Sequence, residues 1–314
     1  MPKLTTSKLL EYSMPLLYVF LFIVLSYTVE NFFSVPNIVG LMLSVAQIGM
    51  VACTMMLCLA SRDFDLSVGS TIAFAGVLGA MILEHTQSVT LAVGGALIAG
   101  ALIGAGNGVL IAYLRVNALI ATLATMLIVR GLAFIVSNGQ AVGIVDEGFI
   151  NFGDARLLGM PLPIWVTGAC FLVFGVLLNH TVFGRNTLAI GGNPEAARLA
   201  GVKVEKLRVW IFLLQGLVTA LAGLILASRI TSGQPNAATG FELDVISACV
   251  LGGVSLQGGK ARILGVLIGV LIMGTVDNVM NLLNVDAFYQ YLVRGVILLV
   301  AVLLDQLKSK GARG

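Results

Sequence analysis

The residues that could do chemistry in this sequence are polar side chains that stand inside long apolar runs. Their amide and hydroxyl groups offer hydrogen-bond donors and acceptors in segments that otherwise hold hydrocarbon. Such groups could line a path for a polar, uncharged solute, or they could hold neighbouring helices together; the sequence is equally compatible with both interpretations. The candidates for the path are Gln47, Asn107, Thr122, Thr125, Gln215, Asn278 and Asn281.

Ionisable residues inside apolar runs are functional candidates for the same reason, because a charge is costly at membrane depth. Arg130, Asp277 and Arg294 stand in such runs. Asp277 and Arg294 have a similar predicted depth, so we expect an ion pair, which could serve the solute or only lock two helices together. Asp63 and Asp65 precede an apolar run, where carboxylates favour a helix N-terminus, and capping is the expected role.

Other kinds of chemistry find little support in the residue types. The two histidines, His85 and His180, stand at the ends of apolar runs without a ligand cluster, so no metal site is expected. There is no paired set of catalytic carboxylates and no G-x-x-x-x-G-K-[ST] loop, which argues against an intramembrane enzyme and against nucleotide binding. The cysteines lie inside apolar runs without a C-x-x-C pair and are interpreted as small buried side chains: Cys53, Cys58, Cys170 and Cys249.

The elements that position these polar residues must be membrane-spanning helices. The sequence is 58% hydrophobic and 11% charged, whereas a soluble domain has roughly 25% charged residues. The net charge of +3 is small and scattered, so nucleic acid is not an expected partner. Long apolar runs, rather than short alternating ones, exclude an outer-membrane barrel.

Apolar runs long enough to cross a membrane occur roughly ten times. We expect the first run to be a retained span and not a signal peptide, because no small-residue cleavage site follows it. The eighth run is short and rich in Gly, so it could be broken or re-entrant. The predicted spans are residues 14–34, 37–60, 66–83, 89–113, 117–136, 162–179, 209–228, 243–256, 262–282 and 287–304.

The distribution of Lys and Arg predicts the orientation of these spans. Cationic residues concentrate in every second loop and at both ends, where Lys3, Lys8, Lys308 and Lys310 lie, and such residues mark cytoplasmic loops. Both termini are therefore predicted to be cytoplasmic. The predicted cytoplasmic segments are 1–13, 61–65, 114–116, 180–208, 257–261 and the C-terminal tail.

The two halves of the chain resemble each other weakly. "FDLSVGS" at 64–70 is similar to "FELDVIS" at 241–247, and "LASR" occurs at 59–62 and again at 226–229. With about five spans in each half, the second half must be inverted relative to the first, which is a transporter architecture. The sequence thus predicts an all-α integral membrane protein of two inverted five-helix repeats. Chance similarity among Gly-, Ala- and Leu-rich segments is the alternative.

The repeat would place Asn107 and Asn278 at related positions in the two halves. We expect Asn107 to face a cavity, because Gly104, Gly106 and Gly108 thin the helix wall around it. A carboxamide offers both donors and an acceptor, which suits a solute covered in hydroxyl groups.

The predicted cytoplasmic loop 180–208 contains a charged, helix-forming stretch. Asn193 is a good N-cap, Pro194 suits the first helical position, and Gly201 is a natural stop. The predicted helix has about two turns, so it can neither span a membrane nor stay folded alone in water. It could lie on lipid, but it lacks the large apolar anchors of interfacial helices. A protein partner on the cytoplasmic side explains it better.

Three motifs, taken together, resemble a known family. "FGRNTLAIGGNPEAARLAGV" at 183–202, "DFDLSVGS" at 63–70 and "ISACVLGGVSLQGGKARILG" at 246–265 are similar to signatures of monosaccharide ABC importer permeases. The similarity extends from about residue 14 to residue 307. Where the wider family usually has "GGIDLSVGS", this chain has "SRDFDLSVGS" at 61–70, and this variant resembles the branch that imports L-arabinose. Related permeases import ribose, galactose or xylose.

The resemblance implies a homodimer in the lipid of the bacterial inner membrane. It also implies a cytoplasmic ATPase subunit with two nucleotide-binding domains that holds Mg-ATP, and a periplasmic sugar-binding protein. This chain itself would carry no cofactor and catalyse no reaction. The ATPase would bind a coupling helix made of Gly192, Asn193, Pro194, Glu195, Ala196, Ala197, Arg198 and Leu199.

The longest predicted outer loops, 137–161 and 229–242, are expected to receive the binding protein. Arg156 and Arg229 are their clear cations and could pair with carboxylates on that partner. An ion-driven secondary transporter is the alternative of a different class, because inverted repeats occur there too. The predicted coupling helix argues against it.

Overall fold

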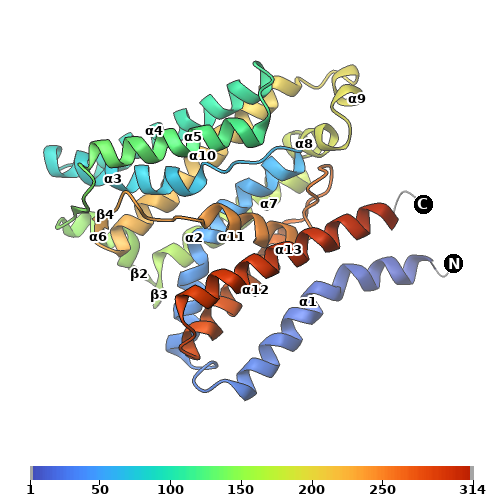
Figure 1. Ribbon diagram of the computed structural model, residues 1–314, viewed down its shortest axis with the longest axis horizontal. Helices are drawn as coiled ribbons and strands as arrows, with labels where there is room; N and C mark the ends of the chain where they lie inside the picture. Colours follow the sequence, from blue (N-terminus) through green and yellow to red (C-terminus); the bar gives the residue numbers. More distant parts are fainter. Residues whose placement is uncertain (1–2, 312–314) are drawn as a thin grey trace.

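The chain is almost entirely helical (Figure 1). The computed structural model describes the backbone of residues 3–311 and the side chains of residues 14–303 and of Gln306. Lys3, Lys8, Lys308 and Lys310, which support the predicted orientation, have side chains outside this part. The helices are α1 (Lys3–Thr28), α2 (Val35–Ala60), α3 (Val68–Thr86), α4 (Val89–Ala112), α5 (Ala118–Val136), α6 (Glu147–Asp154), α7 (Leu162–His180), α8 (Val182–Gly192), α9 (Pro194–Leu199), α10 (Val204–Arg229), α11 (Phe241–Leu251), α12 (Ile263–Leu282) and α13 (Ala287–Gly311).

Two pairs of very short strands accompany the helices in the described part of the chain. Strand β1 (Val142–Gly143) pairs antiparallel with β4 (Ser232–Gly233) and so joins two loops that are far apart in the sequence. Strand β2 (Arg156–Leu157) pairs with β3 (Met160–Pro161) in a tight hairpin.

Seven described helices are long and apolar enough to cross a membrane, namely α2, α3, α4, α5, α7, α10 and α12. Helices α1 and α13 contain shorter described apolar stretches, Met14–Thr28 and Ala287–Leu303. Helix α11 has 11 residues, about 16 Å at 1.5 Å per residue, and cannot alone cross a hydrocarbon core of about 30 Å. The predicted count of ten is therefore approximate, and the eighth predicted span is a short helix.

Helix ends follow the local sequence. The N-caps of α2, α4 and α5 are Ser34, Ser88 and Asn117, and each side chain accepts a hydrogen bond from a backbone amide in the first turn. Such caps satisfy amides that have no partner within the helix. Because Ser34 starts α2 and α1 ends at Thr28, the predicted first span of 14–34 extends too far.

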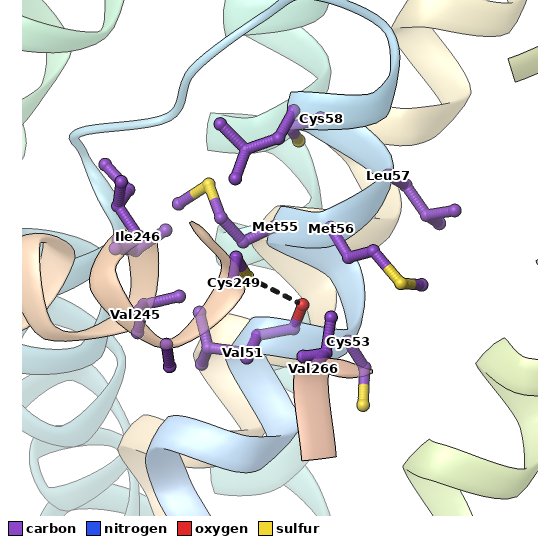
Figure 2. Packing of buried hydrophobic residues seen from close by; sticks show 14 of the residues in the cluster. Val51, Cys53, Met55, Met56, Leu57, Cys58, Val245, Ile246, Cys249 and Val266 are labelled. Atoms are coloured by element: carbon purple, nitrogen blue, oxygen red, sulfur yellow. Dashed lines mark hydrogen bonds between the residues drawn. The ribbon is translucent and has the colours of Figure 1, made fainter. Parts of the chain in front are cut away.

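The core is built around α2, which packs against α7, α10, α11 and α12. Figure 2 shows Val245, Ile246 and Cys249 of α11 on one side of α2, whereas Met56 and Leu57 point away from α11. The Cys249 thiol donates to the Ala52 carbonyl at 3.5 Å. Residues 45–60 of α2 are buried on every face, which explains why this part of the helix is apolar all round, and all four cysteines are buried and free, as the sequence predicts.

Helices α4 and α10 make the most extensive helix pair, and glycines permit their close approach. A Cβ on Gly104 would lie 2.1 Å from the Phe212 carbonyl oxygen, and one on Gly216 would lie 2.1 Å from the Gly100 carbonyl oxygen. Small residues allow this backbone contact between membrane helices. Gly104 and Gly108, on either side of Asn107, therefore accommodate α10 and not a cavity, whereas Gly106 has open space beside it.

The two motifs that suggested a repeat come together where α3 and α11 begin. A Cβ on Gly69 would lie 2.4 Å from the Ala238 carbonyl oxygen and 2.6 Å from Glu242 Oε2. Each helix follows a non-helical segment, residues 61–67 before α3 and residues 230–240 before α11. Figure 1 shows α3 leading toward α6 and β4, whereas α11 leads toward the side of α8.

The non-helical segment 230–240 lies beside α3, itself a candidate membrane span. The backbone of Gly233 is so close to α3 that a Cβ there would lie 2.6 Å from the Gly76 carbonyl oxygen. Arg130 of α5 donates from Nη1 to the carbonyls of Pro235 and Ala237, both at 2.7 Å. Protein contacts of this kind supply the hydrogen bonds that irregular backbone needs at membrane depth.

The molecule has two ends that differ in what they carry. In Figure 1, α8, α9 and both ends of the described chain lie to the right, and α6 with the four short strands lies to the left. We call these the α9 end and the α6 end.

Candidate substrate pocket and coupling surface

A polar pocket of about 440 Å³ lies between α2, the start of α11, α12 and α13. This volume falls within the range of small-molecule sites. The pocket brings together five predicted residues from distant parts of the sequence. They are Gln47, Asp277, Asn278, Asn281 and Arg294. Apolar walls are added by Ile48, Ile72, Leu226, Ala238 and Phe241.

Arg294 forms the charged centre of this pocket. Its Nε and Nη2 donate to the two carboxylate oxygens of Asp277, both at 3.0 Å, and its Nη1 donates to Asp244 Oδ2 at 3.3 Å. A guanidinium that faces a carboxylate with two parallel bonds is the geometry in which such pairs are strongest. The cluster ties α13 to both α12 and α11. Asp244 was not singled out in the sequence, although it stands in the "FELD" motif.

Gln47 is the buried amide of the pocket wall. It is 8% exposed, and its Nε2 has no hydrogen-bond partner among the described residues. Its Oε1 accepts a hydrogen bond from Arg229 Nη1 at 3.3 Å, and the same nitrogen donates to the Leu43 carbonyl. An unpaired buried donor is costly, so Gln47 has a hydrogen bond to give to a molecule that enters the pocket.

Asn278 forms a reciprocal amide pair with Asn37 across α12 and α2. Asn278 Nδ2 donates to Asn37 Oδ1 at 2.8 Å, and Asn37 Nδ2 donates back at 3.0 Å. Asn281, one turn along α12, is exposed and accepts from Gln290 Nε2 at 2.9 Å. The amides of α12 thus contact neighbouring helices and line the pocket at the same time.

Asn107 does not face a cavity in this structure, so that expectation is wrong here. Its side chain is 1% exposed; Nδ2 donates to Ser67 Oγ at 3.0 Å, and Oδ1 accepts from Thr125 at 2.6 Å. Ser67 in turn donates to Asp65 Oδ1 at 2.6 Å. This buried cluster holds α4 and α5 to the segment before α3, and it also shows Asp65 accepting from Ser67 as a turn-forming carboxylate.

Two further predicted path residues lie away from the polar pocket. Gln215 is fully buried, with Oε1 4.0 Å from the Cys58 thiol and with an Nε2 that has no partner in the described structure. Thr122 is fully buried and donates to the Ala118 carbonyl of its own helix at 2.8 Å.

The charged stretch of the sequence forms α9, with the predicted ends. Asn193 Oδ1 accepts from the amides of Glu195 and Ala196, Pro194 is the first helical residue, and Gly201 has a positive φ of 86°. Ala197 alone of the six helical residues is buried, against Ile190 and Val204, whereas Leu199 is 90% exposed. A short helix that is buried through one small residue leaves Leu199 exposed to a partner.

Salt bridges fix α9 on α10. Arg198 pairs with Glu195 at 2.6 Å and with Glu205. Behind them, Arg208 Nε lies 3.1 Å from Asp63 Oδ2. Burial raises the pKa of Asp63 to about 6, against the opposing effects of Arg208 and of the Ser61 hydroxyl. A hollow of about 750 Å³ beside α9 is lined by these charges and by Arg62 and Arg115.

The two predicted docking arginines have different environments. Arg156 is exposed on β2 at the α6 end, and it remains a candidate for surface contacts. Arg229 is half-buried and donates into the pocket wall, so it does not present its charge outward. A larger hollow of about 1010 Å³ lies between the end of α3 and the loop before α6, and it holds no predicted path residue.

The described part of the chain contains no group of three or more His, Cys, Asp or Glu side chains placed to hold a metal ion. The pocket itself is lined by amides, a hydroxyl, and a guanidinium paired with two carboxylates, set among apolar side chains. Such a site can bind and release a polar molecule without changing it chemically.

A bundle of membrane-length helices with a polar pocket between them is an arrangement typical of a transport protein, a membrane permease. The comparison with known proteins agrees: residues 37–302 match the family described as "Branched-chain amino acid transport system / permease component". The chain belongs to this permease family.

Individual relatives cover nearly the whole chain. The L-arabinose transport system permease protein AraH of Escherichia coli (strain K12) is 57% identical over 303 residues, which are 96% of this chain and 92% of that protein. The L-arabinose ABC transporter permease protein AraH of Azospirillum brasilense is 54% identical over 95% of this chain and 88% of its own length. The ribose import permease protein RbsC of Escherichia coli (strain K12) is 44% identical over 89% of this chain and 88% of its own length. No solved structure matches the chain.

Proposed function

We propose that this chain is the membrane-spanning subunit of an ATP-driven importer for L-arabinose. The observation that carries the proposal is 57% identity, over 96% of the chain, to a permease named for L-arabinose transport. The ribose permease is less similar, at 44% identity. Ribose, galactose and xylose are the alternative substrates.

The polar pocket supports an uncharged sugar as cargo. A pentose carries hydroxyl groups that both donate and accept, and Gln47 Nε2, the Asn278 amide and the carboxylates of Asp244 and Asp277 offer complementary groups. Except for Gln47 Nε2, these groups already have protein partners, so most contacts with sugar are exchanged and not simply gained. That favours weak binding and release, as a transport pathway requires.

The exposed face of α9 supports coupling to an ATPase. The proposed assembly contains two copies of this chain in the bacterial inner membrane, with both termini and α9 on the cytoplasmic side. A partner ATPase with two nucleotide-binding domains would hold Mg-ATP and contact α9. A periplasmic sugar-binding protein would deliver sugar at the α6 end.

Purification of the chain with its native partners tests the proposal. We expect an ATPase subunit to copurify, and we expect its turnover in liposomes to rise with the binding protein and L-arabinose more than with ribose, galactose or xylose at equal concentration. ATPase turnover that responds equally to all four sugars would reject L-arabinose as the specific substrate. Sugar uptake that follows an ion gradient without ATP would reject the importer class.

The contact at α9 can be tested separately. Leu199→Glu places a charge on the most exposed apolar side chain of the helix, so we expect loss of ATPase copurification at unchanged expression. Leu158→Glu is the matched control, because Leu158 is 84% exposed at the β2–β3 turn of the α6 end. Equal copurification by both variants would mean that α9 rests on lipid.

A further inference from the structure

Three segments of the chain meet at the C-terminal end of α2, at the α9 end of the molecule. The Ala60 carbonyl accepts from the Gly259 amide at 2.9 Å. The backbone of Gly191, at the end of α8, is so close that a Cβ there would lie 1.7 Å from the same carbonyl oxygen and 2.4 Å from the Gly259 nitrogen. The segments that lead into α3, α9 and α12 therefore touch through their backbones.

Arg62 joins the same three segments through its side chain. Its Nε donates to the Gln257 carbonyl at 2.6 Å, and its Nη2 donates to the Gly192 carbonyl at 2.9 Å. Gly192 directly precedes the cap of α9, and Gln257 belongs to the loop between α11 and α12. One guanidinium thus connects the entrance of α9 to the loop that joins α11 and α12.

The backbone of Arg62 has an unusual conformation that accompanies these two side-chain hydrogen bonds. Its φ is +68°, a region that residues with a side chain seldom adopt and that persists where surrounding contacts over-determine it. A Cβ on Gly258 would lie 2.4 Å from Arg62 Cγ, so Gly258 leaves the room that the arginine side chain occupies. The surroundings fit Arg62 in this position.

Arg62 also stands in the non-helical segment that leads into α3. Where α3 and α11 begin, the two segments meet through Gly69, Ala238 and Glu242, and Ile72, Ala238 and Phe241 line the polar pocket. A displacement of α9 can therefore reach both helices of that contact. It reaches α3 through Arg62 and segment 61–67, and it reaches α11 through Gln257 and the loop that follows α11.

We propose that Arg62 is a positioning residue that transmits movement of α9 to α3 and α11 and thereby changes the polar pocket. The inference rests on the proposed function, because it assumes that a partner moves α9. Arg62 touches no sugar; it acts through the two backbone segments that it connects.

The planar fork of the guanidinium is essential to this role, because it donates in two directions at once. Lysine keeps the charge but is a point donor on a flexible stem and cannot reproduce both bonds in fixed geometry. Arg62→Lys and Arg62→Gln should therefore behave alike. Arg115→Gln is the matched control, because Arg115 lines the same hollow, is exposed and also has a positive φ, of 56°.

The experiment reconstitutes each variant in liposomes with the ATPase and the sugar-binding protein, and measures ATP hydrolysed per L-arabinose imported. For both Arg62 variants we expect this ratio to rise about tenfold, within the usual range of coupling between distant sites, with ATPase binding retained. Arg115→Gln should keep the wild-type ratio. A wild-type ratio in either variant would overturn the proposal. In Arg62→Lys it would mean that the positive charge alone suffices, and in Arg62→Gln it would mean that neither the charge nor the guanidinium is needed.

A distance measurement between α9 and the α11–α12 loop tests directly whether Arg62 holds these two segments together. Spin labels at Ala200→Cys and Lys260→Cys, two exposed positions at the end of α9 and in the α11–α12 loop, in a chain whose four native cysteines are alanine, should keep one narrow separation with and without ATP when Arg62 is present. Arg62→Gln should make the separation change with ATP. An unchanged separation in that variant would overturn the inference, whereas a wild type that couples no ATP hydrolysis to import would count against the proposed function itself.

Discussion

Gln47 and Gln215 are both buried carboxamides on membrane helices, and they separate a pathway role from a packing role. Each has an Nε2 without a hydrogen-bond partner among the described residues, but only Gln47 lines the polar pocket. We expect Gln47→Leu to lower sugar import about fivefold or more, because one lost hydrogen bond costs about 1 kcal/mol, which corresponds to a factor of about five. Import assays with matched expression would measure this.

Gln215→Leu is the control for this prediction. Its Oε1 is only 4.0 Å from a thiol, so replacement by an apolar side chain of similar size removes an unpaired donor and little else. We expect wild-type import and equal or higher thermal stability. Equal losses of import in the two variants would show that a position in the polar pocket is not what makes Gln47 important for import.

Asp63 predicts a pH dependence of stability. Its pKa is raised by burial to about 6 in the folded protein, against about 3.9 for an unfolded Asp. As pH falls from 8 to 4, the folded state takes up a proton before the unfolded state does, so Asp63 contributes stability that increases toward low pH. Between pH 8 and pH 4 this change amounts to about 2 kcal/mol.

Asp63→Asn removes this titration while it keeps the shape of the side chain. We therefore expect the difference in Tm between wild type and Asp63→Asn to shift in favour of the wild type as pH falls from 8 to 4. Thermal unfolding in detergent at several pH values measures the shift. A difference in Tm that stays constant with pH would contradict the prediction.

Residue type and spacing located the charged pair and the amides of the pocket, but they could not separate Gln47 from Asn107. Both are carboxamides in long apolar runs, and the difference that matters is the partner across the helix interface: Asn107 meets Ser67 and Thr125. Those contacts join helices through the tertiary fold, and no local pattern encodes them. Asp244 was missed for the same reason, because its role depends on Arg294 from a distant helix.

At the scale of elements, the α4–α10 pair depends on glycine at defined positions. A Cβ at Gly104 would lie 2.1 Å from a backbone oxygen of α10, whereas Gly106 has nothing within 4 Å. Gly104→Ala should therefore force the helices apart and cost about 1–3 kcal/mol. Gly106→Ala should be neutral or stabilise by up to about 1 kcal/mol, because alanine favours helix.

Thermal unfolding of both variants in the same detergent compares the two positions. The expected result is a lower Tm for Gly104→Ala and an unchanged or higher Tm for Gly106→Ala. If the two alanines lowered the Tm equally, helix flexibility and not contact with α10 would explain the glycines.

Apolar length predicted the long helices well, because a helix in lipid must satisfy its backbone internally. It was weaker where the chain is not one uninterrupted helix. Segment 230–240 is held by Arg130 of α5 and by α3, contacts that a window of hydropathy does not contain. The capped α9 was predictable because its signals are local, at Asn193, Pro194 and Gly201; α6 and α8 have no comparable apolar signal and were not predicted.

At the scale of the whole molecule, the two ends suit different partners. Arg156 is exposed at the α6 end, whereas Arg229 is engaged with Gln47. We expect Arg156→Glu to weaken docking of the sugar-binding protein in a salt-sensitive manner, because charges at an interface rim mainly set the association rate. Association rates at two salt concentrations measure this. Arg229→Glu should instead lower import with docking little changed.

The docking prediction fails if Arg156→Glu associates like the wild type at low salt, where exposed charges act most strongly. Docking that weakens equally with Arg229→Glu would mean that the half-buried arginine turns outward in the complex.

The contact between segment 230–240 and α3 also constrains how the chain is made. Helix α3 emerges from the ribosome long before residue 238, yet the residues that contact its flank at Gly69 and Gly76 lie between positions 223 and 242. Irregular backbone is not tolerated against lipid, so segment 230–240 can enter the bilayer only after α3 is there to receive it. The N-terminal half must therefore be inserted in the membrane before the segment that packs against α3 has been synthesised.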